Sequence, residues 1–265
     1  MKAKVALMLA GIAIAAVALS GPAEAQMQKV KVATEGAYAP FNFKDTSGQL
    51  QGFDVDIAKA LCAKAKFDCE IVAQDWDGII PGLLAKKYDA IISSMAITAE
   101  RQKKVLFTDK YANTPSRFVA KKGSNIEITP AGLKGKRVGV QRATVHENFV
   151  RAKFPEADVV VYDTTDNANA DLAAGRLDLR LDDSVALDLG FLKTDAGKDF
   201  VFVGPGFYEP REILGNGSGI ALRKQDTALG DAFNKALKEI RANGTYKKIN
   251  DKYFSFDVYG PETGS

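Results

Sequence analysis

The chain has 265 residues, of which 46% are hydrophobic, so it is long and apolar enough to bury one large or two medium-sized cores. Its 36 basic and 33 acidic residues leave a formal net charge of +3, and the two signs are mixed along the sequence. A nucleic-acid-binding protein would show a basic stripe, so this composition argues against that class.

The N-terminus has the pattern of a secretory signal peptide. Lys2 and Lys4 give a positive start, residues 5–19 are almost wholly apolar, and Ala23 and Ala25 place small residues where a signal peptidase cuts. The alternative is a membrane anchor, but an apolar run of about 15 residues is short of the roughly 20 that span a bilayer. We therefore predict residues 1–25 to be a cleaved signal peptide and the mature chain to be exported.

The two cysteines, Cys62 and Cys69, lie at the end of a predicted helix and the start of a predicted strand. An even number of cysteines in an exported protein favours a disulfide, with two free buried thiols as the alternative. A metal site is disfavoured, because the one histidine, His146, is far along the chain and two thiolates alone do not close a site. We expect neither a metal nor a cofactor.

Short β-like runs alternate with amphipathic helical stretches along the chain. The predicted strands are at 29–34, 69–73, 88–93, 137–141, 158–162, 177–181 and 220–222. The predicted helices are at 54–66, 76–86, 145–153, 167–174 and 226–243, and a glycine-rich stretch occupies 204–219. This alternation predicts parallel sheets with helical crossovers, arranged as two α/β units in series.

Several short motifs occur in a fixed order along the mature chain. They are ATEGAYAPF at 33–41, GFDVDI at 52–57, DWDGIIP at 75–81, DAIISSMAIT at 89–98 with Arg101, FTD at 107–109, LKGKRVGV at 133–140, GRLD at 175–178 and GTY at 244–246. In this order they resemble the periplasmic solute-binding proteins for polar amino acids, in particular the lysine/arginine/ornithine- and opine-binding branch. The resemblance covers essentially the whole mature chain.

The resemblance implies an α/β fold of the two-lobed type II periplasmic binding protein class, each lobe a mixed, mostly parallel sheet flanked by helices. Lobe 1 would comprise 26–112 and 217–265, and lobe 2 would comprise 117–207. Hinge segments would lie at 113–116 and 208–216. The ligand would bind between the lobes, which close around it.

An amino acid carries a carboxylate and an ammonium, and both must be paired in a cleft that excludes water. Arg101 is the candidate for the carboxylate, because its planar fork matches two oxygens and keeps its charge. By the resemblance, Ser93, Ser94 and Ala96 follow a strand whose end also lines the site, with backbone amides that hold the carboxylate. Ala96 replaces a serine common in relatives of the basic-amino-acid type, so the amide remains and a hydroxyl is lost.

In the second lobe, Thr144 begins a helix whose free N–H groups suit a carboxylate, and it can be a plain N-cap at the same time. Val145 stands where relatives often have a hydroxyl, so we expect backbone amides to make that contact. Asp183 matches the family carboxylate that takes the ligand ammonium. Its neighbour Asp182 is expected to point away from the cleft, since adjacent strand residues face opposite sides.

Tyr38 and Trp76 are expected to flank the ligand side chain by stacking and cation–π attraction. Glu35 would meet a distal positive charge, and Gln141 would line the same region. His146 is expected at the surface or behind the ligand contacts.

The resemblance therefore implies a monomer that binds a cationic amino acid, arginine first and lysine or ornithine next, and delivers it to an inner-membrane ABC permease. An arginine-derived opine, histidine and glutamine are the alternative ligands, and a receptor is the alternative partner. An enzyme on the same fold is disfavoured by the single histidine and the lack of a G-x-S-x-G nucleophile motif.

Overall fold

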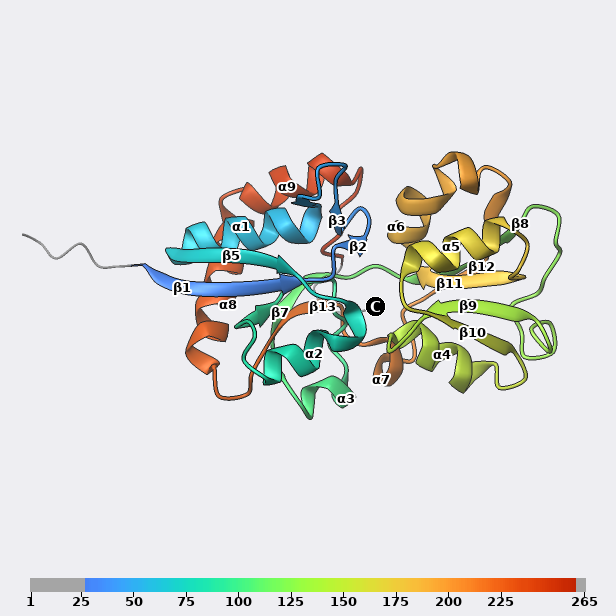
Figure 1. The fold of residues 1–265 in the computed structure, drawn as a ribbon, viewed down its shortest axis with the longest axis horizontal. Coiled ribbons are helices and arrows are strands. Elements are labelled where there is room, and N and C mark those ends of the chain that lie inside the picture. Colours follow the sequence, from blue (N-terminus) through green and yellow to red (C-terminus); the bar gives the residue numbers. More distant parts are fainter. Residues whose placement is uncertain (1–26, 261–265) are drawn as a thin grey trace, which may run out of the picture.

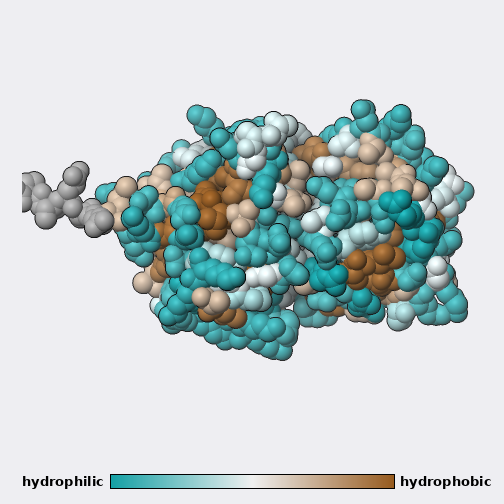
Figure 2. Space-filling view, viewed as in Figure 1, coloured by the Kyte–Doolittle hydropathy of each residue, from teal (hydrophilic) through white to brown (hydrophobic). Residues whose placement is uncertain are grey.

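The computed structural model describes residues 27–260, so the predicted signal peptide and the last five residues lie outside the described part of the chain. Two α/β lobes lie side by side along the long axis of the molecule (Figure 1). The face shown in Figure 2 is mainly hydrophilic, with small separate apolar patches. Within residues 27–260, none of the helices combines the length and apolar character needed to cross a membrane.

The first lobe is built on a five-stranded sheet in the order β5-β1-β6-β13-β7. Its strands are β1 (Gln28–Thr34), β5 (Phe67–Ala73), β6 (Ala90–Ile91), β7 (Leu106–Ala112) and β13 (Ser218–Leu222). Strands β5, β1 and β6 run parallel, and β13 is antiparallel to both β6 and β7. A small antiparallel sheet adds β2 (Ala37–Tyr38), β3 (Asn42–Lys44) and β4 (Leu50–Gln51).

Helices cover both faces of this sheet. One face packs against α1 (Phe53–Ala65), α8 (Thr227–Ala242) and α9 (Thr245–Tyr253), where Val30 and Val32 share a core with Ile57 and Phe233. The other face packs against α2 (Trp76–Leu84), followed by the short α3 (Ala99–Gln102).

The second lobe repeats the architecture in the order β10-β9-β11-β8-β12. Its strands are β8 (Ser116–Lys121), β9 (Arg137–Gln141), β10 (Asp158–Tyr162), β11 (Leu179–Asp183) and β12 (Phe200–Phe207). Helices α4 (Val145–Lys153) and α7 (Arg211–Leu214) pack on one face, and α5 (Thr165–Ala173) and α6 (Ser184–Leu187) pack on the other. Two further helical turns follow α6, at Asp188–Leu192 and Asp195–Gly197.

The chain crosses between the lobes twice, from β7 to β8 and from β12 to β13. The second crossing returns the chain to the first lobe, where β13 inserts between β6 and β7. The Asn113 N–H, in the first crossing, donates to the Val258 carbonyl at 2.8 Å. The C-terminal segment is therefore hydrogen-bonded to the first crossing.

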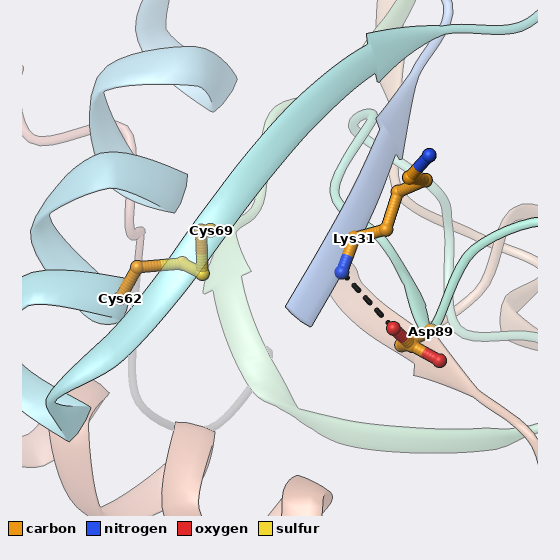
Figure 3. The surroundings of a disulfide bond; sticks show 4 residues. All are labelled: Lys31, Cys62, Cys69 and Asp89. Atoms are coloured by element: carbon orange, nitrogen blue, oxygen red, sulfur yellow. Dashed lines mark hydrogen bonds between the residues drawn. A yellow bond between two sulfur atoms is a disulfide. The ribbon is translucent and has the colours of Figure 1, made fainter. Parts of the chain in front are cut away.

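Cys62 near the end of α1 and Cys69 in β5 form a disulfide, which confirms the predicted pairing (Figure 3). The same view shows the Lys31 N–H of β1 donating to Asp89 at 3.0 Å, a contact that joins β1 to the turn before β6. The disulfide therefore ties α1 to the edge strand β5, and the hydrogen bond ties two interior strands of the sheet together.

Replacing both cysteines with alanine is expected to lower the free energy of unfolding by about 2.5 kcal/mol, because the bond closes a short loop of the unfolded chain. Urea unfolding of Cys62→Ala/Cys69→Ala measures this. Reduced wild-type protein serves as the control and should match the double variant. An unchanged urea midpoint would show that the disulfide contributes nothing.

Candidate ligand-binding site

Two adjoining cavities of about 70 and 40 Å³ lie between the lobes. Both are lined by Tyr38, Ser94, Ala96, Val145 and His146. The larger is bounded on one side by Asp183, and the smaller holds the remaining candidates, which are Glu35, Trp76, Ser93, Arg101, Gln141 and Thr144. The structure thus brings all eleven residues predicted from the sequence to one place.

The lobes touch each other around these cavities. The Tyr38 hydroxyl donates to Asp182 at 2.7 Å, and the Gln141 side-chain amide donates to Glu35 at 2.5 Å. The Trp76 indole N–H donates to the Ala143 carbonyl at 3.3 Å. Each bond joins one residue of the first lobe to one of the second, so the site is shared between lobes.

Arg101 lies in α3, which begins at the N-cap Thr98. Its guanidinium donates to the Ala96 carbonyl at 3.0 Å and lies 5.2 Å from the Trp76 ring centre. Burial lowers the pKa of Arg101 from 12.5 to about 10. No carboxylate in residues 27–260 forms an ion pair with it, so its charge is available to an anionic group of a ligand.

Ala96 forms an antiparallel bridge with Ser218. The bonds of this pairing run from the Ile97 N–H to Gly217 and from the Gly219 N–H to Met95. Neither bond uses the amide of Ala96, which is therefore free to meet a ligand oxygen at the cavity wall.

The two serines before Ala96 are held inside the first lobe. Ser93 Oγ accepts from the Glu35 N–H at 2.9 Å. The Ser94 N–H donates to the Tyr111 hydroxyl at 2.8 Å, and Ser94 Oγ donates to Asp54 at 3.0 Å. The expectation that the Ser94 amide holds a ligand carboxylate is therefore wrong, because that N–H already has an acceptor within the lobe.

Thr144 is the N-cap of α4, and its hydroxyl accepts from the Glu147 N–H and donates to the Gln141 carbonyl. The hydroxyl is thus committed to capping. The first N–H groups of a helix have no partner within the helix, so the amides at Val145 and His146 remain to meet a negative group.

Both strand-end carboxylates of β11 line the site, and the prediction that Asp182 points away from it is wrong. Asp182 reaches Tyr38 across the cleft, in the smaller cavity. Asp183 is the N-cap of α6, so the alternation of a strand no longer applies there. The two side chains therefore face different parts of one site.

The electrostatic surroundings of the two carboxylates differ. Burial would raise the pKa of Asp182, but Arg180 and then His146 hold it below the usual value. Burial raises the pKa of Asp183 to about 6, and its hydrogen-bond partners are neutral, namely the Thr114 hydroxyl and two backbone amides of α6. Asp182 is therefore already neutralised, while Asp183 suits a cationic group.

Glu35 is only 7% exposed and lines the smaller cavity, whereas Asp183 lines the larger one. Burial raises its pKa from 4.5 to about 7, and Asp182, Asp166 and Asp75 add to the rise. Its side-chain partner is the neutral amide of Gln141. A cation beside Glu35 would reverse this penalty.

His146 is buried, so the surface alternative for this residue is wrong. Its Nδ1 lies 3.3 Å from Asp182, and burial lowers its pKa. Its position in the sequence is consistent with this burial. His146 follows Val145 in the first turn of the helix whose N-terminus is predicted to meet the ligand.

Two sheets of this topology, joined by two crossings and enclosing a polar cleft, define a solute-binding protein. Residues 30–256 match the bacterial extracellular solute-binding proteins, family 3, and the chain belongs to that family. The resemblance drawn from the motifs is confirmed, as is the two-lobed fold.

Named relatives cover nearly the whole chain. The L-arginine-binding protein of Pseudomonas aeruginosa is 50% identical over 250 residues, 94% of this chain and 96% of that protein. The histidine-binding periplasmic protein of Salmonella typhimurium is 47% identical over 235 residues, 88% of this chain and 90% of that protein. A solved Salmonella typhimurium periplasmic binding protein of high arginine specificity matches with a TM-score of 0.79 at 33% identity, over 86% of this chain and all of that one.

Proposed function

We propose that this protein captures a cationic amino acid in the periplasm, with arginine as the preferred ligand, and delivers it unchanged to an ABC permease. The observation that carries the proposal is the buried Glu35, whose pKa is raised and whose partner is neutral. Arg101 and Asp183 suffice for the two charges that every amino acid carries. A third charged group in the site therefore calls for a ligand with a distal cation.

In this proposal the ligand carboxylate meets Arg101, the Ala96 amide and the N-terminus of α4. The ammonium meets Asp183. The aliphatic part lies along Tyr38 and Trp76, and the guanidinium reaches Glu35. The arginine-binding relative supports this ligand, and the histidine-binding relative shows that the family also takes other side chains.

We propose lobes at 26–112 with 217–265 and at 117–207, with hinges at 113–116 and 208–216. The separate sheets and the two crossings support this division. Periplasmic relatives support export of the chain after removal of residues 1–25.

Glu35→Gln is expected to weaken arginine binding by about 1.5–3 kcal/mol, because a charge-assisted hydrogen bond becomes a neutral one. The affinity of the variant for glutamine, which has no distal charge, should fall by less. Calorimetric titration of both ligands measures the difference.

Asp166→Asn is the matched control, because Asp166 is a solvent-exposed carboxylate close enough to raise the pKa of Glu35 but lines neither cavity. It should change arginine affinity little. Equal losses for arginine and glutamine in Glu35→Gln would contradict a distal cation.

Arginine binding is expected to release protons between about pH 5 and 8. Glu35 has a pKa of about 7 and Asp183 of about 6 before binding, and a cation beside each lowers both values. Affinity should therefore rise with pH through this window and level off above it. Calorimetry at pH 6.5 in buffers of different ionisation enthalpy counts the protons, and Glu35→Gln should release fewer. Proton uptake would contradict the assignment.

A further inference from the structure

Asp54 is a fully buried carboxylate that lies behind the site and lines neither cavity. It is the second residue of α1, whose N-terminus is fixed by bonds from the Phe53 and Asp54 N–H groups to the Pro40 and Phe41 carbonyls. Gly52 makes this approach possible, because a Cβ there would lie 2.3 Å from the Phe41 carbonyl oxygen. The helix N-terminus also favours a negative charge at Asp54.

Three side chains donate hydrogen bonds to this carboxylate. They are the Asn42 amide at 2.7 Å, the Tyr111 hydroxyl at 2.8 Å and the Ser94 hydroxyl at 3.0 Å. Burial raises the pKa of Asp54 to about 6, and these three donors oppose the rise.

The direction of the Asn42 and Tyr111 bonds is set by a second contact. Asn42 Oδ1 accepts from the Gly36 N–H at 2.7 Å, so the amide nitrogen of Asn42 must face Asp54. The Tyr111 oxygen accepts from the Ser94 N–H at 2.8 Å, so its proton is directed to Asp54. Three donors therefore converge on Asp54, and an ionised carboxylate can accept from all of them.

These partners hold two segments of the first lobe that carry candidate ligand-binding residues, namely the loop at Glu35 and the turn at Ser94. Gly36 directly follows Glu35, and its φ is +81°. Ser94 has a φ of +45°, a left-handed conformation that a non-glycine residue adopts only when its surroundings impose it. The loops also meet directly, through the Glu35 N–H and Ser93 Oγ.

We infer that Asp54 is a positioning residue for ligand binding, an anchor that fixes the Glu35 loop and the Ser94 turn relative to each other. This inference rests on the proposed function for its ligand, but not for its geometry. It assigns a binding role to a side chain that does not touch the ligand.

Asp54→Asn tests the inference because it keeps the shape and removes one acceptor. The new amide can turn its nitrogen toward Tyr111 or toward Asn42. Toward Tyr111 it meets the hydroxyl proton, which can turn away only toward the Ser94 N–H, so the Ser94 turn loses a contact. Toward Asn42 it meets the Asn42 amide nitrogen, donor to donor. If Asn42 flips, its nitrogen then faces the Gly36 N–H, again donor to donor. One of the two loops must therefore lose its contact.

Combining Asn42→Asp with Asp54→Asn should restore the network. The new carboxylate at position 42 accepts from Gly36 and from the new amide at position 54. The amide oxygen at 54 then accepts from Tyr111 and Ser94. The negative charge moves from position 54 to position 42, and every donor regains an acceptor.

The measurements are arginine affinity by calorimetry and hydrogen exchange of the Ser94 amide in ligand-free protein, both on protein shown to be folded by circular dichroism. Asp54→Asn should weaken binding and speed exchange by at least about tenfold each, and the double variant should recover most of both. Asn250→Ala is the control: it removes a buried polar side chain of the same lobe, bonded to Phe256 and Val258, and should lower stability while leaving both readouts unchanged.

Normal affinity and exchange in Asp54→Asn, or a double variant no better than the single one, would overturn the inference. If Asp54→Asn does not fold, Tyr111→Phe replaces it, because it removes the hydroxyl that links Ser94 to Asp54. Tyr111→Phe should speed Ser94 exchange and weaken binding in the same direction, and unchanged values would overturn the inference. If wild-type protein does not bind arginine, the proposed function fails, while Ser94 exchange still decides the role of Asp54.

Discussion

Arg101→Ala is expected to lower the affinity for arginine by about 2–5 kcal/mol, the usual cost of removing one partner from a buried charge pair. The guanidinium is positioned by the Ala96 carbonyl and the Trp76 ring, and it forms no ion pair within the described residues. Its removal would leave the ligand carboxylate with backbone amides alone. Calorimetry measures the loss, and an unchanged unfolding midpoint shows that the fold is kept.

Arg117→Ala is the matched control. Arg117 also stacks on an aromatic ring, with its guanidinium carbon 4.2 Å from the Phe202 ring centre, but it lines neither cavity of the site. Its replacement should leave arginine affinity unchanged. Near-normal binding by Arg101→Ala would mean that the ligand carboxylate is held elsewhere.

Asp183→Asn is expected to cost a similar amount, about 2–5 kcal/mol, because the ligand ammonium would lose its one unneutralised carboxylate. Asparagine is as good an N-cap as aspartate, so α6 should keep its first turn. Loss of affinity with an unchanged unfolding midpoint therefore identifies a charge effect.

Asp188→Asn is the control for this variant. Asp188 lies five residues further along the chain and pairs with Lys193 at 2.6 Å outside the two cavities. The Asp188→Asn variant should bind arginine normally. If Asp183→Asn also binds normally, the ammonium is taken by another group.

Local patterns predicted several elements of the second lobe to the residue. The strands at 137–141 and 158–162 and the helix at 145–153 have the bounds expected from the sequence. Each is defined by signals within its own segment, such as the N-cap Thr144.

Elements that depend on distant partners were missed or misjudged. The strand expected at 88–93 is only Ala90–Ile91, because the chain then bends toward the site at Ser94. Strands β7, β8 and β12 were not predicted. Strand β7 pairs with β13, about a hundred residues later, and no local periodicity reports such a pairing.

The location of the candidate residues was predicted better than the hydrogen bonds among them. Motif order identified eleven residues that do line the two cavities. The roles of Asp182 and Ser94 were misjudged, since their partners Tyr38 and Asp54 come from distant parts of the chain. Asp54 itself was quoted within a motif, but its acceptor role becomes visible only when three donors are placed around it.

Calorimetric titration of the purified wild-type protein with arginine, lysine, glutamine, glutamate and octopine tests the central claim most directly. The account predicts one site per chain, with arginine bound more tightly than lysine and both far more tightly than glutamine or glutamate. A ligand at a hundred times its dissociation constant should also stabilise the fold by about 2.7 kcal/mol. Glutamine or glutamate binding more tightly than arginine would contradict a cationic ligand.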